Sequence, residues 1–374
     1  MKKLIEIEEQ LRSTFVERDD EIRGLSLSIL SDNNMLLIGP PGTAKSMVVH
    51  SWSSHIIEQK FFSALLSKFS TPEELAGPFS IKSLGEDRYI RQTNGMLPEA
   101  HIAFLDETFN GNSGVLNFLL TLMNERKFAN DGKFIKVPLL TLVGASNQIP
   151  EPEDALEAMY DRFLLKFIVS PIIEDENFVK MIMMAKDYKP EVTITLPEIE
   201  HCREQVQKVK VPKSVIRTLA DLRALLHHDG ILTTDRTFKR SSDIIKAEAF
   251  LNGRAEVVED DLDVLKNVLW TNPDDLKKCY TDILTIINPD KNKVLDIWDT
   301  CSLGFDKFKN EEDPRKITDL GSELLVNLKA SKEKVHEYYE KAKASNNHAK
   351  EVLDIEKKIH NLINAVYKGL GLDF

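Results

Sequence analysis

The chain has 374 residues, more than one hydrophobic core usually serves, so we expect a main domain with one or two smaller ones. Its 42% hydrophobic and 29% charged residues are typical of a folded globular protein and exclude wholesale disorder. The net charge of -11 would repel a polyphosphate backbone at long range. Nucleic acid is therefore not the expected partner, although net charge alone leaves a local basic channel open.

The three cysteines, Cys202, Cys279 and Cys301, have none of the short spacings that hold zinc or form redox pairs, so we expect them to be reduced. The first ten residues lack the continuous apolar stretch of a signal peptide, and no window approaches about 20 apolar residues. We expect a cytoplasmic protein without a membrane span.

Strands and helices are predicted to alternate in the first half of the chain. Apolar residues recur at helical spacing over 4–29, and the short apolar run 35–38 is closed by Gly-Pro-Pro-Gly. Further buried strands are predicted at 101–105 and 139–143, each followed by polar residues and a helical pattern. This alternation predicts an α/β fold, with a parallel sheet covered by helices on both faces.

Two hairpins are expected to interrupt this layout. One runs from 79 to 93 with its turn at 85–88, and the other from 126 to 137 with its turn at 130–133. The second contains Asp-Gly between apolar arms, a strong turn signal. Such hairpins either touch something outside the subunit or are plain surface decoration.

After residue 170 the strand signals fade. Residues 196–270 are predicted to form several amphipathic helices, and 317–367 has the apolar spacing of a helical bundle or coiled coil. We predict three domains: an αβα core over 1–185, an all-α lid over 190–272 and a helical C-terminal region over 273–374.

A glycine-rich loop follows the first predicted strand. Its sequence is Gly39-Pro40-Pro41-Gly42-Thr43-Ala44-Lys45-Ser46. A strand, such a loop and a helix that opens with Lys-Ser place free backbone N–H groups around phosphate oxygens. We expect ATP to bind here and at the adjoining Met47, with Lys45 at the β- and γ-phosphates and Ser46 on Mg²⁺. Ala44 stands where glycine is usual, which is tolerable if this residue has helical dihedrals.

Two later strands also end in polar residues. Asp106 and Glu107 follow a buried strand, where Asp106 can hold the Mg²⁺ shell and Glu107 can accept a proton from the attacking water. Alone, such a pair is more often a solvated loop or a helix cap. Asn147 follows the next strand and would help to orient the water, although asparagine there is usually a turn former.

Two arginines are candidates for contact with nucleotide phosphates. Arg162 has no phosphate partner that we can place in its own subunit, so we interpret it as a finger supplied to a neighbour. The alternative is an ordinary surface pair with Asp161. Arg236, near a predicted helix start, could reach across to the nucleotide, with Lys239 and Arg240 as competitors for that role or all three as an exposed basic helix end.

This set resembles the AAA+ ATPases of the MoxR group, and within it the RavA-like branch. The resemblance covers most of residues 15–170, with a thinner match to about residue 282. It is carried by these stretches: 68–78, 95–100, 119–128, 145–147 and 156–162.

The resemblance implies that 39–46 is the Walker A loop, Asp106 and Glu107 the Walker B pair, Asn147 sensor 1, Arg162 the arginine finger and Arg236 sensor 2. Alanine before the lysine is familiar in this group. A ring of six subunits is also implied, with both hairpins facing its pore and Glu125 and Arg126 near the subunit interface. RavA-like proteins carry an inserted β domain, whereas 283–374 is predicted to be helical throughout.

Members of the group often act with a protein that contains a von Willebrand factor A domain and remodel other protein complexes. We therefore expect an ATP-driven protein remodeller. The alternatives are a nucleic-acid motor, supported by basic and aromatic residues on the hairpins, and a nucleotide-gated scaffold that binds a partner through its C-terminal helices. The hairpin residues in question are Lys82, Arg88, Tyr89, Arg91, Lys133 and Lys136.

Overall fold

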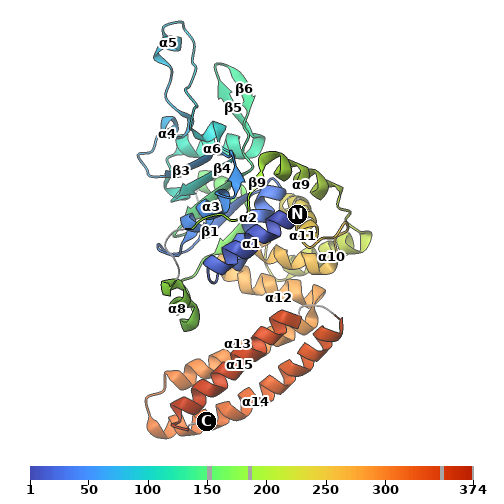
Figure 1. The fold of residues 1–374 in the computed structure, drawn as a ribbon. Helices are drawn as coiled ribbons and strands as arrows, with labels where there is room; N and C mark the ends of the chain where they lie inside the picture. Colours follow the sequence, from blue (N-terminus) through green and yellow to red (C-terminus); the bar gives the residue numbers. More distant parts are fainter. Residues whose placement is uncertain (150–153, 184–187, 346–348, 373–374) are drawn as a thin grey trace. The chain divides into compact units, whose positions relative to one another are not determined.

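A computed structural model describes residues 1–149, 154–183, 188–345 and 349–372 (Figure 1). The chain divides into two compact units, Met1–Cys279 and Tyr280–Phe374. None of the described helices is both long enough and apolar enough to cross a membrane.

A five-stranded sheet forms the centre of the first unit, and all its strands are parallel. The order across the sheet is β3-β4-β7-β1-β8. The predicted strands at 35–38, 101–105 and 139–143 correspond to β1, β4 and β7, so the α/β prediction is confirmed. The strands are β1 (Asn34–Ile38), β3 (Phe61–Leu65), β4 (Ile102–Asp106), β7 (Thr141–Ser146) and β8 (Phe163–Ile168).

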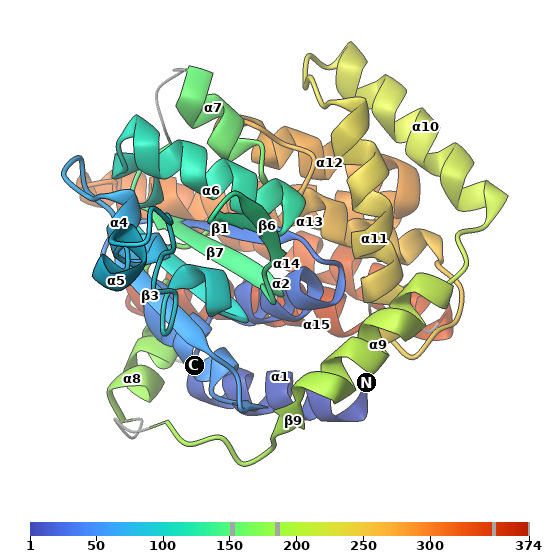
Figure 2. The same ribbon diagram turned by 90° about the horizontal axis from the view of Figure 1, so that it is seen from above.

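Helices cover both faces of this sheet. In Figure 2 the sheet runs between α6 and α7 on one side and α1 on the other. Every residue of β1 and of β7 is buried, which explains why these strands are continuous apolar runs. The helices of this part of the chain are α1 (Lys2–Thr14), α2 (Asp19–Leu30), α3 (Lys45–Ser53), α6 (Ser113–Glu125) and α7 (Asp154–Tyr160). Two short 3-10 turns accompany them, η1 (Leu97–Glu99) and η2 (Thr108–Asn110).

The two expected hairpins have different outcomes. The second is present as β5 (Lys127–Asn130) and β6 (Lys133–Lys136), joined by Asp131 and Gly132, which both have positive φ. The first forms only in part: its arms pair at the antiparallel Phe79–Arg91 bridge, where the Ser80 N–H donates to the Ile90 carbonyl oxygen and the Gln92 N–H to that of Pro78, both at 2.8 Å. The Ser80 side chain accepts from the Ser83 N–H and begins the short helix α5 (Ile81–Leu84) instead. A further short helix, α4 (Pro72–Ala76), precedes this insert.

The rest of the first unit is mainly helical. Helix α8 (Asp175–Met183) follows β8, and the chain then forms β9 (Ile194–Thr195), which pairs with β2 (Ile56–Ile57). The region predicted as the lid contains α9 (Leu196–Lys208), α10 (Lys213–His228), α11 (Asp235–Leu251) and the 3-10 turns η3 (Glu259–Asn267) and η4 (Pro273–Asp275). Helix α11 packs against α2, α9 and β8, which fixes the lid on the core.

The second unit is a bundle of long helices. Its three helices α13 (Pro289–Lys309), α14 (Pro314–Ser345) and α15 (Ala349–Gly369) each pack against the other two. Their shared core includes Val294, Leu328 and Ile359, all fully buried. Helix α12 (Leu276–Ile287) precedes them. The described residues from 283 onward contain helices and no strand, so the all-α prediction for this region is confirmed.

Candidate nucleotide site

The predicted phosphate loop and the polar strand ends meet at one edge of the sheet. The loop follows β1, Asp106 ends β4, and Asn147 comes directly after β7. Because β4, β7 and β1 are neighbours and parallel, their carboxyl ends are adjacent. The structure therefore brings together Asp106, Glu107, Asn147 and the loop, and we call this side of the sheet the carboxyl edge.

Two glycines give the loop its shape. A Cβ on Gly39 would lie 2.1 Å from the Val169 carbonyl oxygen, so only glycine lets the strand and loop approach this closely. Gly42 has a φ of +81, and a Cβ there would meet nothing within 4 Å. The loop thus encloses open space beside backbone N–H groups, a cradle that fits phosphate oxygens.

Ala44 has an unexpected conformation. Its φ of 64 and ψ of 17 are left-handed, so the right-handed helical dihedrals that would make alanine harmless are absent. The left-handed region costs a residue with a Cβ about 1 kcal/mol. The loop keeps the backbone path that glycine would adopt here, and the methyl group adds strain.

Helix α3 begins directly after Ala44 and has no side-chain cap. The N–H groups of its first turn, from Lys45, Ser46 and Met47, therefore have no acceptor within the helix and are available to an anion. Lys45 donates from Nζ to the carbonyl oxygens of Gly39 at 2.6 Å and Pro40 at 2.8 Å. Burial lowers the pKa of Lys45, although Asp106 and Glu107 act in the opposite direction.

Glu107 is held by the side chains around it. Asn147 Nδ2 donates to Glu107 Oε1 at 2.5 Å, and Asn110 Nδ2 donates to Oε2 at 3.2 Å. The neighbouring Asp106 accepts from the Glu107 N–H at 3.0 Å. The hydroxyl of Ser46 and the carboxylate of Asp106 are oxygen ligands of the kind that Mg²⁺ prefers. These residues fit a magnesium nucleotide, which when bound supplies the phosphoryl group and its neutralising cation.

Arg18 is a residue of this edge that the sequence did not reveal. It is buried, its Nε donates to the Thr43 carbonyl oxygen at 3.2 Å, and its Nη2 donates to the Ser170 carbonyl oxygen at 2.7 Å. Arg18 therefore joins the phosphate loop to the end of β8. Its partners lie 25 and 152 residues away in the chain, so no local pattern indicates this role.

The arginines lie at the other end of the strands. Arg162 immediately precedes β8, and its carbonyl oxygen accepts from Asn34 at the start of β1. Arg236 Nη2 donates to Asn124 Oδ1 at 3.4 Å, and the charge of Arg236, after burial, lowers the pKa of Arg162. We call this side of the sheet the amino edge.

Further arginines join the same group. Burial and then the charges of Arg236, Arg126 and Arg162 lower the pKa of Arg240 to about 10. Asp32 pairs with Arg126 at 3.4 Å and with Arg203 at 3.1 Å. Among the described residues, the buried atoms Arg162 Nε and Arg126 Nη1 have no hydrogen-bond partner. An excess of guanidinium groups with unused donors is an environment that favours an anion.

Within one chain, the amino edge and the carboxyl edge of the sheet are separated by the length of a strand. Strand β8 separates Arg162 from the carboxyl edge by six residues, or roughly 20 Å of extended chain. An arginine side chain is much shorter. Arg236 lies beside Arg162 and not beside the phosphate loop of its own chain. The competitor Arg240 is also at the amino edge, bonded through Nη2 to Asn33 Oδ1 at 2.8 Å.

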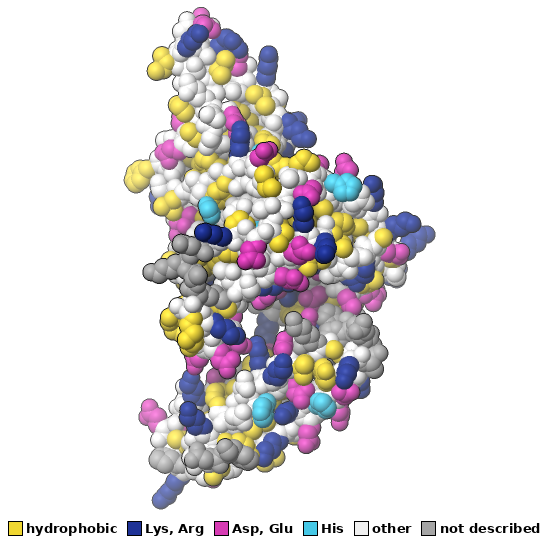
Figure 3. All heavy atoms as spheres, in the orientation of Figure 1, with side chains coloured by type: hydrophobic (Ala, Val, Ile, Leu, Met, Phe, Trp, Pro, Cys, Tyr) yellow, Lys and Arg dark blue, Asp and Glu magenta, His cyan; other side chains and the backbone are white. Residues whose placement is uncertain are grey.

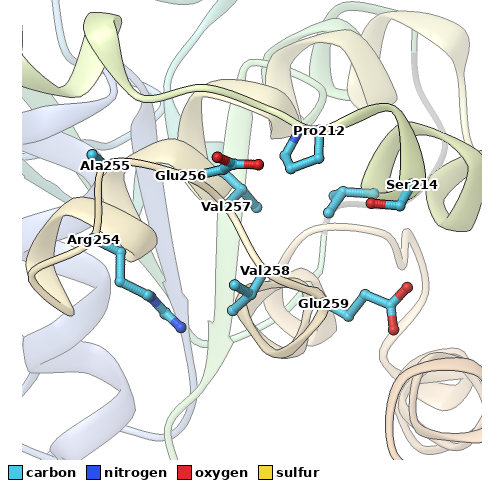
Figure 4. A pocket seen from close by; sticks show the side chains of 9 residues that line it. Pro212, Ser214, Arg254, Ala255, Glu256, Val257, Val258 and Glu259 are labelled. Atoms are coloured by element: carbon cyan, nitrogen blue, oxygen red, sulfur yellow. The ribbon is translucent and has the colours of Figure 1, made fainter.

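A separate groove lies in the lid (Figure 4). Pro212 and Ser214 line it together with the segment 254–259, and no residue of the predicted nucleotide site lines it. Arg254 in its wall pairs with the buried Asp261. This groove contributes nothing to the chemistry of the carboxyl edge.

Comparison with known protein families matches this arrangement. The MoxR domain of the MoxR-vWA-beta-propeller ternary systems matches residues 2–209, and an AAA lid domain matches 214–283. The chain belongs to the MoxR group of AAA+ ATPases. The prediction of that group from the sequence motifs is confirmed, and ATP hydrolysis in general follows from membership.

Individual relatives of this MoxR-group protein are consistent with the family. An uncharacterised protein of Methanocaldococcus jannaschii is 42% identical over 297 residues, which are 79% of this chain and 77% of the relative. The chaperone MoxR1 of Mycobacterium tuberculosis is 26% identical over 172 residues, 45% of each chain. A solved structure from Cytophaga hutchinsonii, assigned as an ATPase, has a TM-score of 0.63 at 18% identity and covers 77% of this chain and 94% of its own. At that identity it shows the shared fold alone.

Proposed function

We propose that this MoxR-group protein binds ATP with Mg²⁺ at the carboxyl edge and hydrolyses it at sites shared between neighbouring copies. Lys45 and the loop N–H groups bind the phosphates, Ser46 and Asp106 hold the cation, and Glu107 accepts the proton of the attacking water. Asn147 positions Glu107. Arg162 and Arg236 of the next copy approach the γ-phosphate.

The arginine group at the amino edge is the observation that carries this proposal. It has unused buried donors and lies about one strand length from the phosphate loop of the same chain. A head-to-tail contact places the amino edge of one copy against the carboxyl edge of the next. Repetition of such a contact gives a ring where its rotation closes, and we propose a ring of six subunits.

We further propose that the ring remodels protein complexes together with a partner that contains a von Willebrand factor A domain. The matched family is named for systems that combine these components, which supports the partner class. The segment 79–93 and the β5–β6 hairpin, which we call the inserts, support a protein client. They expose large apolar side chains: Ile81, Tyr89, Phe134 and Ile135. Placement in the RavA-like branch and residence in the cytoplasm stay predictions.

The charges of the inserts favour a protein client over nucleic acid. Arg88 pairs with Asp131 at 2.8 Å, and Arg91 pairs with Glu73 at 3.0 Å and stacks on the Phe79 ring. Two of the five basic residues named on these segments are thus paired within the chain, which reduces the positive charge available to a phosphate backbone. A nucleic-acid motor needs such charges to be available.

Mixing two inactive variants tests the shared site. Lys45→Ala removes a phosphate ligand and Arg162→Ala removes the finger, so each alone should lose ATP turnover. An equal mixture should recover about a quarter of wild-type turnover, because one interface in four then combines an intact loop with an intact arginine. Arg236→Ala mixed with Lys45→Ala should behave in the same way, with Lys239→Ala as the exposed control. Wild-type turnover by Arg162→Ala alone would contradict the proposal.

A further inference from the structure

Helix α8 exposes apolar side chains on a segment of the core that has no buried residue. Ile182 and Met183 are 65% and 81% exposed, and Ile173 just before the helix is 79% exposed. Phe178, Val179 and Met181 are between 42% and 50% exposed. Figure 3 shows apolar side chains gathered over α8 on the left of the view. Apolar side chains concentrated in this way on so short a segment mark an interaction surface.

A single carboxylate holds the beginning of this helix. Glu17 Oε2 accepts from the Ile173 N–H at 2.9 Å, and Oε1 accepts from the Glu174 N–H and from Asn177 Nδ2, both at 3.0 Å. Burial acts to raise the pKa of Glu17, but these hydrogen bonds outweigh it and the pKa is lowered. Glu17 is therefore charged at neutral pH and caps the α8 segment.

The residue after Glu17 is Arg18, which contacts the phosphate loop. Its Nε donates to the Thr43 carbonyl oxygen, and its Nη2 donates to the Ser170 carbonyl oxygen near the end of β8. The dipeptide Glu17-Arg18 thus forms one continuous link from the phosphate loop to α8. A shift of the Thr43 carbonyl would reach the helix through these two adjacent residues.

Charge and position identify what covers the apolar face. Helix α8 begins seven residues after β8 ends, so it belongs to the carboxyl edge. Its first turn carries Asp175 and Glu176, whereas the amino edge carries the arginine group around Arg162. The two edges of one chain are complementary in charge, which favours a head-to-tail contact between copies.

We propose that the apolar face of α8 docks on the next copy of this chain, and that the Glu17-Arg18 link makes this docking depend on the nucleotide. The inference rests on the shared-site function proposed above and adds the surface that holds the copies together. In the interface between two copies, the arginines contact the nucleotide phosphates and α8 contributes the apolar contact area.

The double variant Phe178→Asp with Ile182→Asp tests the surface in the full chain. We measure the protein concentration at which half of the chains are assembled, by mass photometry and sedimentation velocity with a non-hydrolysable ATP analogue and Mg²⁺. The variant should need at least about tenfold more protein than wild type, as expected for loss of apolar anchors. Leu303→Asp with Val326→Asp, at 62% and 68% exposed positions of the helical bundle, is the matched control and should assemble like wild type.

The outcomes separate this inference from the proposed function. If the α8 variant assembles like wild type, or only loses binding to a different protein, the inference is overturned. The mixing rescue between Lys45→Ala and Arg162→Ala can still succeed in that case, so the shared site stands by itself. If the rescue also fails, the proposed function falls with it.

Replacement of Glu17 tests the link. Wild type should assemble at a lower concentration with the ATP analogue than without nucleotide. The ratio of the half-assembly concentration without nucleotide to that with the analogue should fall toward one in Glu17→Ala. The melting temperature should stay within a few degrees of wild type because Glu17 is only partly buried. Glu17→Gln keeps an acceptor oxygen and should retain part of the ratio. An unchanged ratio in Glu17→Ala would overturn the link.

Discussion

Asn147 donates its side-chain amide to Oε1 of Glu107 at 2.5 Å, so the two polar residues of neighbouring strands form one unit. Glu107 itself has a left-handed φ of 49, which turns its side chain out of the path of β4. Asn147 is exposed and makes this contact from the end of β7. The amide therefore positions the carboxylate that we propose as the general base.

Asn147→Ala should lower kcat for ATP hydrolysis by roughly 10²-fold, because an unheld carboxylate no longer aligns the attacking water. The dissociation constant for ATP should stay within about threefold, since the phosphates are bound by the loop. Steady-state kinetics and equilibrium binding separate the two quantities. Asn110→Ala removes the weaker 3.2 Å contact to the other oxygen and should cost much less. Equal losses in the two variants would argue against a special role for Asn147.

The residues that follow strands could be predicted from the sequence, whereas the packing of the lid could not. The positions of Asp106 and Asn147 follow from the rule that parallel strands of buried residues end at one edge, which holds whatever surrounds the sheet. The location of Arg236 depends on where α11 packs, and that is set by contacts with α2, α9 and β8 far away in the chain. Its place beside Arg162 is therefore visible only in three dimensions.

Local backbone geometry also could not be predicted from the sequence. Helical dihedrals would make Ala44 harmless, but this last loop residue before α3 is left-handed. The insert 79–93 has apolar residues on both arms, yet one serine cap converts part of an arm to helix. In both places a single turn residue decides the path, and periodicity carries no information about it.

Ala44→Gly should raise or preserve the thermal stability of the protein. Glycine removes the cost of a left-handed alanine, about 1 kcal/mol. Part of this gain is lost because glycine gives the unfolded chain more conformational freedom. ADP affinity should not fall, because the loop path is already that of glycine. Differential scanning fluorimetry with and without ADP measures both effects.

The reverse exchange at Gly42 serves as the contrast for this prediction. Gly42→Ala introduces a methyl group at a φ of +81 and into the open space of the phosphate cradle, so both stability and ADP affinity should decrease. Loss of ADP affinity in Ala44→Gly of similar size would show that the methyl group of Ala44 contributes to binding.

We expect Lys166 to make the protein more stable as the pH rises above neutral. It is buried in β8, its Nζ lies 5.2 Å from the Tyr160 ring centroid and 5.7 Å from that of Trp270, and burial lowers its pKa from 10.5 to about 8. The folded state therefore releases this proton more easily than the unfolded state. Between about pH 8 and the unfolded pKa of 10.5 the unfolded chain binds more protons, so the free energy of unfolding rises with pH, by an amount on the order of 3 kcal/mol.

Lys166→Met should remove this rise while keeping the packing volume. At neutral pH the variant should be more stable than wild type, because both states of the wild type are protonated there and the folded state retains a buried charge whose desolvation is only partly offset by the two rings. The advantage should shrink as the pH approaches 10. Urea unfolding across this range measures the difference, and Lys239→Met, at an exposed lysine, should follow the wild-type curve. Parallel curves for wild type and Lys166→Met would mean that Lys166 does not titrate differently in the two states.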